Sequence, residues 1–175
     1  PDPPPRNFVQ ADAAHLPFVA GTFDFVLANH SLEHFTHLAE ALSEIGRVVK
    51  PRGQFYVAVP DSTSVADRLY RWLGRGRGHV NRFRSACELA SMITHATRLP
   101  QVAARPLGTS FSFLNRKNLR TPVQRKLLLL GGGTESSLLI ASCIARLLDR
   151  FLGTCLSFYG WALYFGEMPA GVSDG

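Results

Sequence analysis

The sequence predicts an α/β fold with a mostly parallel sheet flanked by helices, and three observations carry this prediction. Residues 23–29, FDFVLAN, are almost continuously apolar, which is typical of a strand covered on both faces. From Leu38 to Val49 the apolar positions recur at spacings of four, three and four, which indicates one buried face of a helix. Residues 54–60, QFYVAVP, resume a strand. Strand, helix and strand with short links form the right-handed crossover unit of this class.

Length and composition favour one globular domain with a buried core. The chain has 175 residues, of which 46% are hydrophobic and 18% charged. It begins at Pro1 with no apolar run of the kind that directs export, so we expect a trimmed, cytoplasmic chain. Cys87, Cys143 and Cys155 are odd in number and far apart. This spacing argues against a disulfide framework and against a cysteine zinc site.

The remaining elements follow from local signals. We expect a short strand over residues 7–12, an N-cap at Thr36 for the first helix, and an end of that helix at Pro51, with Gly53 in a tight turn. Beyond residue 60 the sequence predicts a helix running into a basic loop over 68–84, a helix from Ser85 with a capping box, a strand over 110–115, a helix over 134–152 and a strand over 158–166.

Charge is distributed unevenly along the chain. Residues 1–67 hold 4 Lys/Arg and 8 Asp/Glu, whereas residues 68–175 hold 15 and 5. Six of the arginines lie in 68–84, among aromatic residues and glycines. Such a stretch fits an exposed lid, a site for an anionic substrate, or a nucleic-acid surface, and we rank the nucleic-acid interpretation lowest.

Three motifs within residues 8–59 resemble the class I methyltransferases that use S-adenosylmethionine, in particular the small-molecule type 11 group. ADAAHLPF is similar to the third strand of that family with its acidic turn, and FDFVLANHSLEHF is similar to the fourth strand and its exit. ALSEIGRVVKPRGQFYVAVP is similar to the following helix, turn and fifth strand, although Arg52 stands where the family usually has glycine. The resemblance covers about a third of the chain and implies a Rossmann-like methyltransferase fold.

The resemblance also implies cofactor contacts. The carboxylate of Asp12 would accept a hydrogen bond from the adenine amino group, and the N–H of Ala13 would contact the ring. Leu16 would belong to an apolar wall for the ring. Asn29 and His30, at the strand exit, would approach the methionine part of S-adenosylmethionine. Without the resemblance, a turn cap would be the better interpretation of Asp12.

Residues 79–93 resemble, more loosely, the region after strand five in which the family often contacts substrate. We therefore take His34, His79 and Arg82 as candidate substrate-binding residues, and the sequence identifies no catalytic residue. A structural role is favoured over acid–base chemistry for the two histidines. We expect no metal site, because His30, His34 and His37 lack the H-E-x-x-H pattern.

The family's glycine-rich G-x-G-x-G loop does not precede residue 6. Its strand order, 3-2-1-4-5-7-6, places the missing strands one and two between strands three and four, so we expect an incomplete fold in which the Asp12 segment has lost its neighbour. The expected parts of this single domain are 1–62 on the cofactor side, 63–110 as a basic helical substrate or lid region, and 111–175 as a strand-helix-strand unit with an antiparallel strand pair.

The expected function is methyl transfer from S-adenosylmethionine to an oxygen, nitrogen or carbon of a small molecule. We expect activity to need an absent amino-terminal half. We expect no transmembrane segment and regard a peripheral anionic surface or a protein as a further partner. Two alternatives remain. One is a catalytically silent interaction module, and the other is a basic domain that binds nucleic acid or a membrane surface through arginines such as Arg75, Arg77, Arg82 and Arg84.

Overall fold

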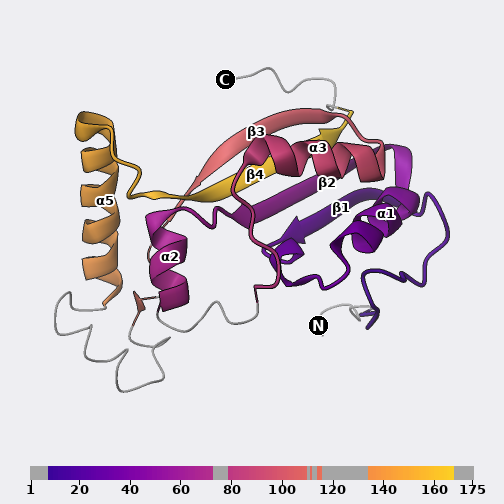
Figure 1. Cartoon of the computed structure of the whole chain (residues 1–175), viewed down its shortest axis with the longest axis horizontal. Coiled ribbons are helices and arrows are strands. Elements are labelled where there is room, and N and C mark those ends of the chain that lie inside the picture. Colours follow the sequence, from indigo (N-terminus) through magenta and orange to yellow (C-terminus); the bar gives the residue numbers. More distant parts are fainter. Residues whose placement is uncertain (1–7, 73–78, 110, 112–113, 116–133, 168–175) are drawn as a thin grey trace, which may run out of the picture.

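The computed structural model describes residues 8–72, 79–109, 111, 114–115 and 134–167, whose strands form one four-stranded sheet with helices beside it (Figure 1). The strands are β1 (Phe23–Asn29), β2 (Val49–Pro60), β3 (Gln101–Gly108) and β4 (Phe158–Gly166). The helices are the 3-10 turn η1 (Leu32–His34), α1 (Leu38–Val48), α2 (Val65–Trp72), α3 (Ala86–Thr97) and α5 (Glu135–Leu152).

The strands lie in the order β1-β2-β4-β3. β1 and β2 are parallel and are joined through α1, whereas β4 pairs antiparallel with both β2 and β3. The α/β class and the carboxyl-terminal antiparallel strands are therefore confirmed. The described sheet is mixed rather than mostly parallel, because only the β1–β2 pairing is parallel. If β1, β2, β4 and β3 are numbered four, five, seven and six, the order reads 4-5-7-6, which is the second part of the family's strand order 3-2-1-4-5-7-6.

Helices α1 and α3 pack on one another and cover one face of the sheet (Figure 1). Along β2 the buried side chains Phe55, Val57 and Val59 alternate, as expected for a strand with one face toward a core. They meet apolar side chains of both helices and of β4. The core cluster is Ala28, Leu32, Leu42, Ile45, Val49, Phe55, Val57, Val59, Phe83, Leu89, Ala90, Ile93, Leu99, Leu163 and Phe165.

The opposite face of the sheet retains apolar side chains at its surface. Leu27 of β1 lies beside Tyr56 of β2, which in turn lies beside Tyr164 of β4. Phe25 and Leu27 are 50% and 59% exposed. The prediction that β1 is covered on both faces is therefore wrong for the described residues. β1 also has a described partner along only one of its edges.

The first helix and the strand after it differ from the prediction at their ends. The N-cap is His37 rather than Thr36, and the helix ends at Val48, so Pro51 lies within β2 instead of stopping the helix. The cause is pairing with β1, which starts at Val49 and then passes a bulge before Gln54. Gly53 sits in that bulge, where an added Cβ would meet a Val49 methyl at 2.6 Å.

Residues 8–11 do not form the predicted strand. Asp12 makes only an isolated bridge to His15, and Phe8 is 83% exposed. A strand needs backbone partners, and no strand of the described part of the chain pairs with this segment.

A strand that the sequence did not reveal, β3, contains Pro106 and lies at the edge of the sheet, where proline is tolerated. The strand predicted at 110–115 falls partly outside the described residues, and Leu114 lies in a 3-10 turn.

The other predicted helices and the last strand are confirmed. The Ser85 hydroxyl accepts a hydrogen bond from the Glu88 N–H at the start of α3, and Thr134 forms a capping box with Ser137 at the start of α5. α2 begins earlier than expected, at Val65, and residues 73–78 of the predicted basic loop lie outside the described residues. α5 lies at one end of the molecule, beyond the sheet (Figure 1). Within the described ranges, no helix combines the length and apolar character needed to cross a membrane.

Replacing Gly160 by alanine should destabilise the sheet. An added Cβ would lie 2.1 Å from the Val59 carbonyl oxygen, so β2 and β4 would have to separate. We expect Gly160→Ala to lower the free energy of unfolding by about 1–3 kcal/mol in urea titrations. Gly108→Ala is the matched control, since its Cβ would meet its nearest atom at 3.7 Å. Equal stability of the two variants would contradict the close approach.

Candidate functional site

The carboxyl ends of β1 and β2 lie together and lead into a polar region. After Asn29 the chain leaves the sheet at His30, whose φ of 50° is left-handed and whose N–H donates to the Ala58 carbonyl oxygen at 2.9 Å. The turn η1 follows at once and turns Glu33 inward. In parallel α/β sheets ligands bind at this edge, so it is the first place to look for a site.

An acid–histidine cluster lies beside η1 and consists of Glu33, His34, Asp67, Arg71 and His79. Glu33 and Asp67 are each 1% exposed. The Arg71 Nε lies 2.9 Å from Asp67 Oδ2, and the His79 Nδ1 lies 4.0 Å from Asp67 Oδ1. The rings of His34 and His79 meet edge to face with centroids 4.9 Å apart. The turn η1, the helix α2 and the segment after residue 78 therefore contribute ionisable groups to one small volume.

Backbone hydrogen bonds hold His79 beside the turn. The N–H groups of Val80 and Asn81 donate to the Glu33 carbonyl oxygen at 2.8 and 3.0 Å. The Asn81 side-chain amide donates to the carbonyl oxygens of Leu32 and Phe35. These four bonds attach the segment after residue 78 to η1. The position of His79 is therefore set by main-chain contacts as well as by its own ring.

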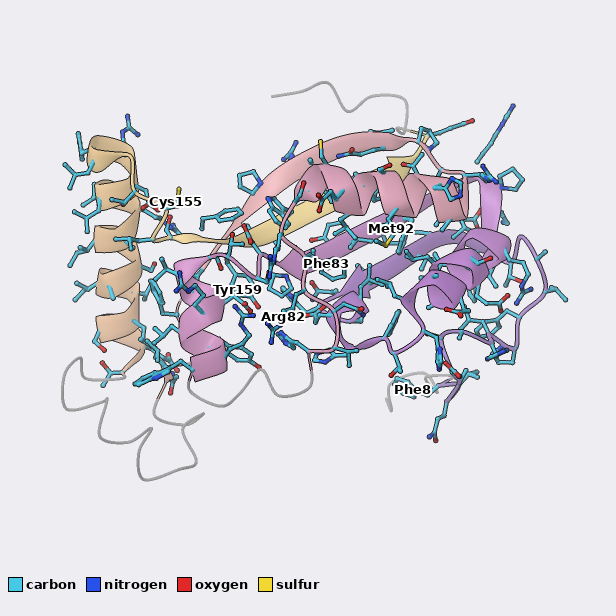
Figure 2. All side chains as sticks on the ribbon, viewed as in Figure 1. Phe8, Arg82, Phe83, Met92, Cys155 and Tyr159 are labelled. Carbon is cyan, nitrogen blue, oxygen red and sulfur yellow. The ribbon has the colours of Figure 1, made fainter. Side chains whose placement is uncertain are left out.

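The start of α2 places Asp67 in the cluster. The Ser64 hydroxyl accepts a hydrogen bond from the Asp67 N–H at 3.1 Å, as an N-terminal cap does, and also donates to the Tyr159 carbonyl oxygen. Arg71 donates to the Ser62 carbonyl oxygen at 2.6 Å while it pairs with Asp67. The segments carrying Tyr159 and Phe83 are both hydrogen-bonded to residues 61–62, and Figure 2 shows these two side chains in the same central region.

Burial governs the protonation of the cluster. It raises the pKa of Asp67, which Arg71 and His79 partly offset, and it lowers the pKa of His79, which Glu33 partly offsets. Burial also raises the pKa of Tyr159, and the nearby Asp67 and Glu33 raise it further. Near neutral pH, His79 is thus biased toward the neutral imidazole, and the Tyr159 hydroxyl keeps its proton. A neutral imidazole can accept a proton or bind a metal ion.

Two buried oxygens of the cluster have no hydrogen-bond partner among the described residues. These are Glu33 Oε2 and Asp67 Oδ1. Buried polar atoms are nearly always satisfied, so unpaired carboxylate oxygens indicate a missing donor or cation. The cluster is therefore suited to bind a group from outside the chain.

The candidate adenine residues lie in a separate segment. The Asp12 side chain is 63% exposed, and its carboxylate accepts a hydrogen bond from the Ala14 N–H at 3.0 Å. That bond lowers the pKa of Asp12, with a smaller effect of His15. Asp12 does cap a turn, and the carboxylate remains accessible for a further hydrogen bond. Ala13 lies in the same turn.

An ion pair on α1 clamps this segment to the rest of the fold. Arg47 pairs with Glu44 at 2.6 Å and donates to the carbonyl oxygens of Phe18 and Leu16 at 2.7 and 3.0 Å. Glu44 in turn accepts a hydrogen bond from the Leu16 N–H at 2.9 Å. The clamp fixes the backbone after Asp12, beside which the described residues place no strand.

The structure brings together part of the predicted site. His30, His34 and His79 meet around Glu33, with the His30 Nδ1 at 3.7 Å from Glu33 Oε1. Arg82 is exposed.

The sequence analysis missed Asp67 and Tyr159 as site residues. The four-residue spacing of Asp67 and Arg71 is a signal that could have indicated a helical ion pair. Tyr159 carried no comparable signal.

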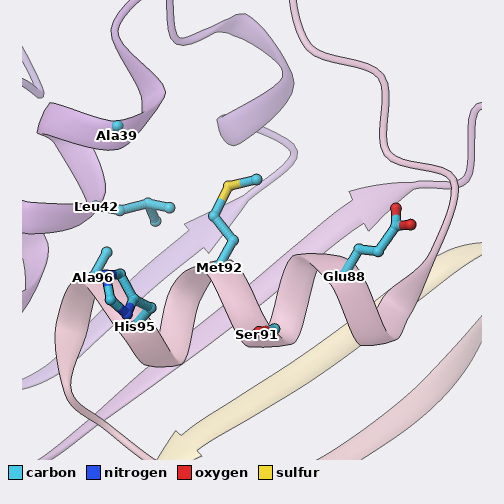
Figure 3. Close-up of a pocket in the computed structure, with 7 residues that line it drawn as sticks. All are labelled: Ala39, Leu42, Glu88, Ser91, Met92, His95 and Ala96. Atoms are coloured by element: carbon cyan, nitrogen blue, oxygen red, sulfur yellow. The ribbon is translucent and has the colours of Figure 1, made fainter.

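A separate hollow of about 550 Å³ lies between α1 and α3 and contains none of the predicted residues. Met92, Leu42 and Ala39 face one another across it (Figure 3). Its lining is mainly apolar, apart from Glu88, Ser91 and His95. It lies on the helical side of the fold and away from the strand ends that define the candidate site.

The strand order, the crossover through α1 and the site at the strand ends define the fold of the class I methyltransferases. Solved structures agree: the [4+2]-cyclase SpnF matches 94% of this chain and 57% of its own, with a TM-score of 0.54 and 21% identity. Phosphoethanolamine N-methyltransferase 2 of Haemonchus contortus, solved with S-adenosylhomocysteine, matches 90% of this chain and 36% of its own, with a TM-score of 0.50 and 13% identity. A cyclase among these structures means that the fold alone does not determine the reaction.

Residues 2–57 match the family model described as a methyltransferase domain. The ubiquinone/menaquinone biosynthesis C-methyltransferase UbiE of Blochmanniella pennsylvanica is 46% identical over 50 residues, which are 29% of this chain and 20% of that protein. The chain thus matches about a fifth of the length of such curated relatives.

Acid should abolish the stability that the Glu44–Arg47 ion pair on α1 contributes to the fold. The hydrogen bond from Arg47, and then that from Leu16, lower the pKa of Glu44 from 4.5 to about 2. Because the folded pKa is depressed, the stabilisation is complete above pH 4.5 and is lost as the pH falls toward 2. We expect Glu44→Gln to lower the thermal unfolding midpoint at pH 7, and the difference from wild type to vanish between pH 4.5 and 2.

The control for this measurement is Glu40→Gln, an exposed position on the same helix. It should change the midpoint at pH 7 less than Glu44→Gln does. A difference between wild type and Glu44→Gln that stays constant down to pH 2 would show that the carboxylate does not stabilise the segment.

Proposed function

We propose that this chain forms part of a methyltransferase that moves the methyl group of S-adenosylmethionine to an oxygen, nitrogen or carbon nucleophile on a small molecule. The observation that carries the proposal is the methyltransferase-domain match over residues 2–57, which ends within β2 and includes the α1 crossover. Strand order and the polar site at the strand ends support it. The sulfonium is already an activated methyl donor, so positioning and exclusion of water supply much of the rate.

The cofactor side of the proposed site consists of Asp12, Ala13, Leu16, Asn29 and His30. Asp12 is suited to accept the adenine amino hydrogen, since its carboxylate is exposed and its turn is held by the α1 clamp. S-adenosylmethionine, when bound, supplies the electrophilic methyl group. Asn29 and His30 lie where β1 ends, and the left-handed backbone of His30 directs the following turn away from the sheet.

The acceptor side of the proposed site is the acid–histidine cluster, with His34 and His79 as substrate contacts. The buried carboxylates favour a polar acceptor that carries a hydrogen-bond donor or a positive charge. Arg82, exposed on the segment leading to α3, is proposed to contact an anionic part of the substrate (Figure 2). The division into parts at 1–62, 63–110 and 111–175 and the cytoplasmic location stay predictions from the sequence.

Cofactor binding is proposed to need strands that lie outside residues 1–175. Two features support this. β1 has a described partner along one edge only, and Phe25 and Leu27 remain exposed on the face that α1 and α3 do not cover. Additional strands along β1, with helices over that face, would bury both side chains and supply the family's glycine-rich loop, which does not precede residue 6.

Calorimetry with S-adenosylhomocysteine tests this proposal on two proteins. Residues 1–175 alone should bind it at least ~100-fold more weakly than the same reading frame extended upstream of Pro1, because several cofactor contacts are absent. Tight binding to residues 1–175 would overturn the need for further strands. A lack of binding to an extended protein that contains the glycine-rich loop would overturn the cofactor assignment itself.

In the extended protein, Asp12→Asn should weaken S-adenosylhomocysteine binding about tenfold, because a charge-assisted hydrogen bond to the adenine amino group becomes a neutral one. Asparagine keeps an oxygen for the Ala14 N–H, so the turn should persist. Asp24→Asn is the matched control, since Asp24 is exposed and pairs with Lys50. If both variants bind like wild type, Asp12 only caps its turn.

A further inference from the structure

We propose that Glu33, His34 and His79 bind one divalent transition-metal ion, with Zn²⁺ as the best match. This inference goes beyond methyl transfer and does not rest on it. One ligand atom of each side chain can be chosen so that all of them lie within 4.8 Å of one another. Glu33 and His34 are adjacent in the turn after β1, and His79 comes from the segment after α2.

The chemistry of the three side chains matches a known kind of zinc site. Two imidazole nitrogens and one carboxylate oxygen form a His₂Glu donor set, which leaves a fourth position of the tetrahedron for water or another ligand. Ligand atoms around such an ion lie about 3.4 Å apart, so separations of up to 4.8 Å must shorten by as much as about 1.4 Å. His34 is exposed, whereas the backbone at Glu33 and beside His79 is held by the bonds between η1 and residues 80–81.

A buried oxygen independently indicates a missing cation. Glu33 is 1% exposed, and its Oε2 has no hydrogen-bond partner among the described residues. Its other oxygen, Oε1, lies 3.7 Å from the His30 Nδ1, and the unpaired Oε2 is available to bind an ion. A bound ion would satisfy this oxygen without any change in the backbone.

The charge around the site also favours a divalent cation. Three carboxylates, Glu33, Asp61 and Asp67, lie close enough to influence one another, and Arg71 is the guanidinium that pairs with Asp67. When ionised, these groups leave an excess of two negative charges in a mostly buried region. A doubly charged ion would balance that excess, whereas a neutral ligand would not.

Outer contacts are arranged to orient His79. Its Nδ1 faces Asp67 Oδ1 at 4.0 Å, and the Tyr70 ring stacks on the imidazole with centroids 5.8 Å apart. At 4.0 Å the two atoms are too far apart for a hydrogen bond, so the ring must move about 1 Å toward Asp67 before Nδ1 can donate to it. That movement would leave Nε2 for the metal, as in the carboxylate–histidine–metal arrangement of many zinc sites. Asp67 is thus a positioning residue in this proposal, and Arg71 holds it in turn.

Isothermal calorimetry tests the proposal: metal-free protein of residues 1–175 is titrated with Zn²⁺ alone. We expect one ion per chain, and we expect the Co²⁺ form to show the intense visible absorption of a tetrahedral site. Glu33→Gln and His34→Ala should each lower Zn²⁺ affinity at least ~100-fold, and Asp67→Asn by about 10–100-fold. His34 is exposed, so its removal tests the site without disturbing the core.

His95→Ala is the matched control, because His95 is also an exposed histidine but lies on α3, away from the cluster. It should keep wild-type affinity, and circular dichroism should show that every variant is folded. The proposal is overturned if the wild-type chain binds no Zn²⁺, or if His34→Ala and Glu33→Gln bind it as tightly as His95→Ala. It is also overturned if bound Co²⁺ lacks tetrahedral absorption.

Discussion

The pairing of β2 with strands on both of its sides is the constraint on which the rest of the structure depends. β2 is the longest described strand and links the parallel crossover of β1 and α1 to the antiparallel β4. Its buried residues Phe55, Val57 and Val59 form the face of the sheet against which α1 and α3 pack. Gly160 allows β4 to approach this strand closely. Because the candidate site lies at its carboxyl end, any shift of β2 would move the site.

The site is assembled by contacts between segments that are far apart in sequence. Glu33 follows β1, Asp67 belongs to α2, and His79 is brought in by hydrogen bonds from residues 80–81 to η1. Two buried carboxylates in one cluster are costly unless paired, and Arg71 pairs with only one of them. The cluster therefore holds buried negative charge that is not fully paired, and a ligand, an acceptor group or a metal ion would stabilise it. Regions of this kind are commonly functional.

The fold and the site place different limits on function. The sheet and its crossover support a nucleotide-type cofactor at the strand ends, yet the same fold serves more than one chemistry. Among the described residues, the Asp12 segment is held by Glu44 and Arg47 rather than by a strand. The open edge of β1 and the exposed Leu27 leave room for strands that would complete a cofactor pocket. In the proposed function, cofactor binding depends on such further strands.

The sequence by itself determined the α/β class, the crossover, α3, α5 and β4, because these depend on local periodicity and caps such as Ser85 and Thr134. Only the tertiary structure decided where α1 ends, since pairing with β1 begins at Val49 and overrides the local signal of Pro51. It also decided that Pro106 lies in an edge strand. The meeting of Glu33 with His79 could not be read from spacing, because hydrogen bonds between distant segments create it.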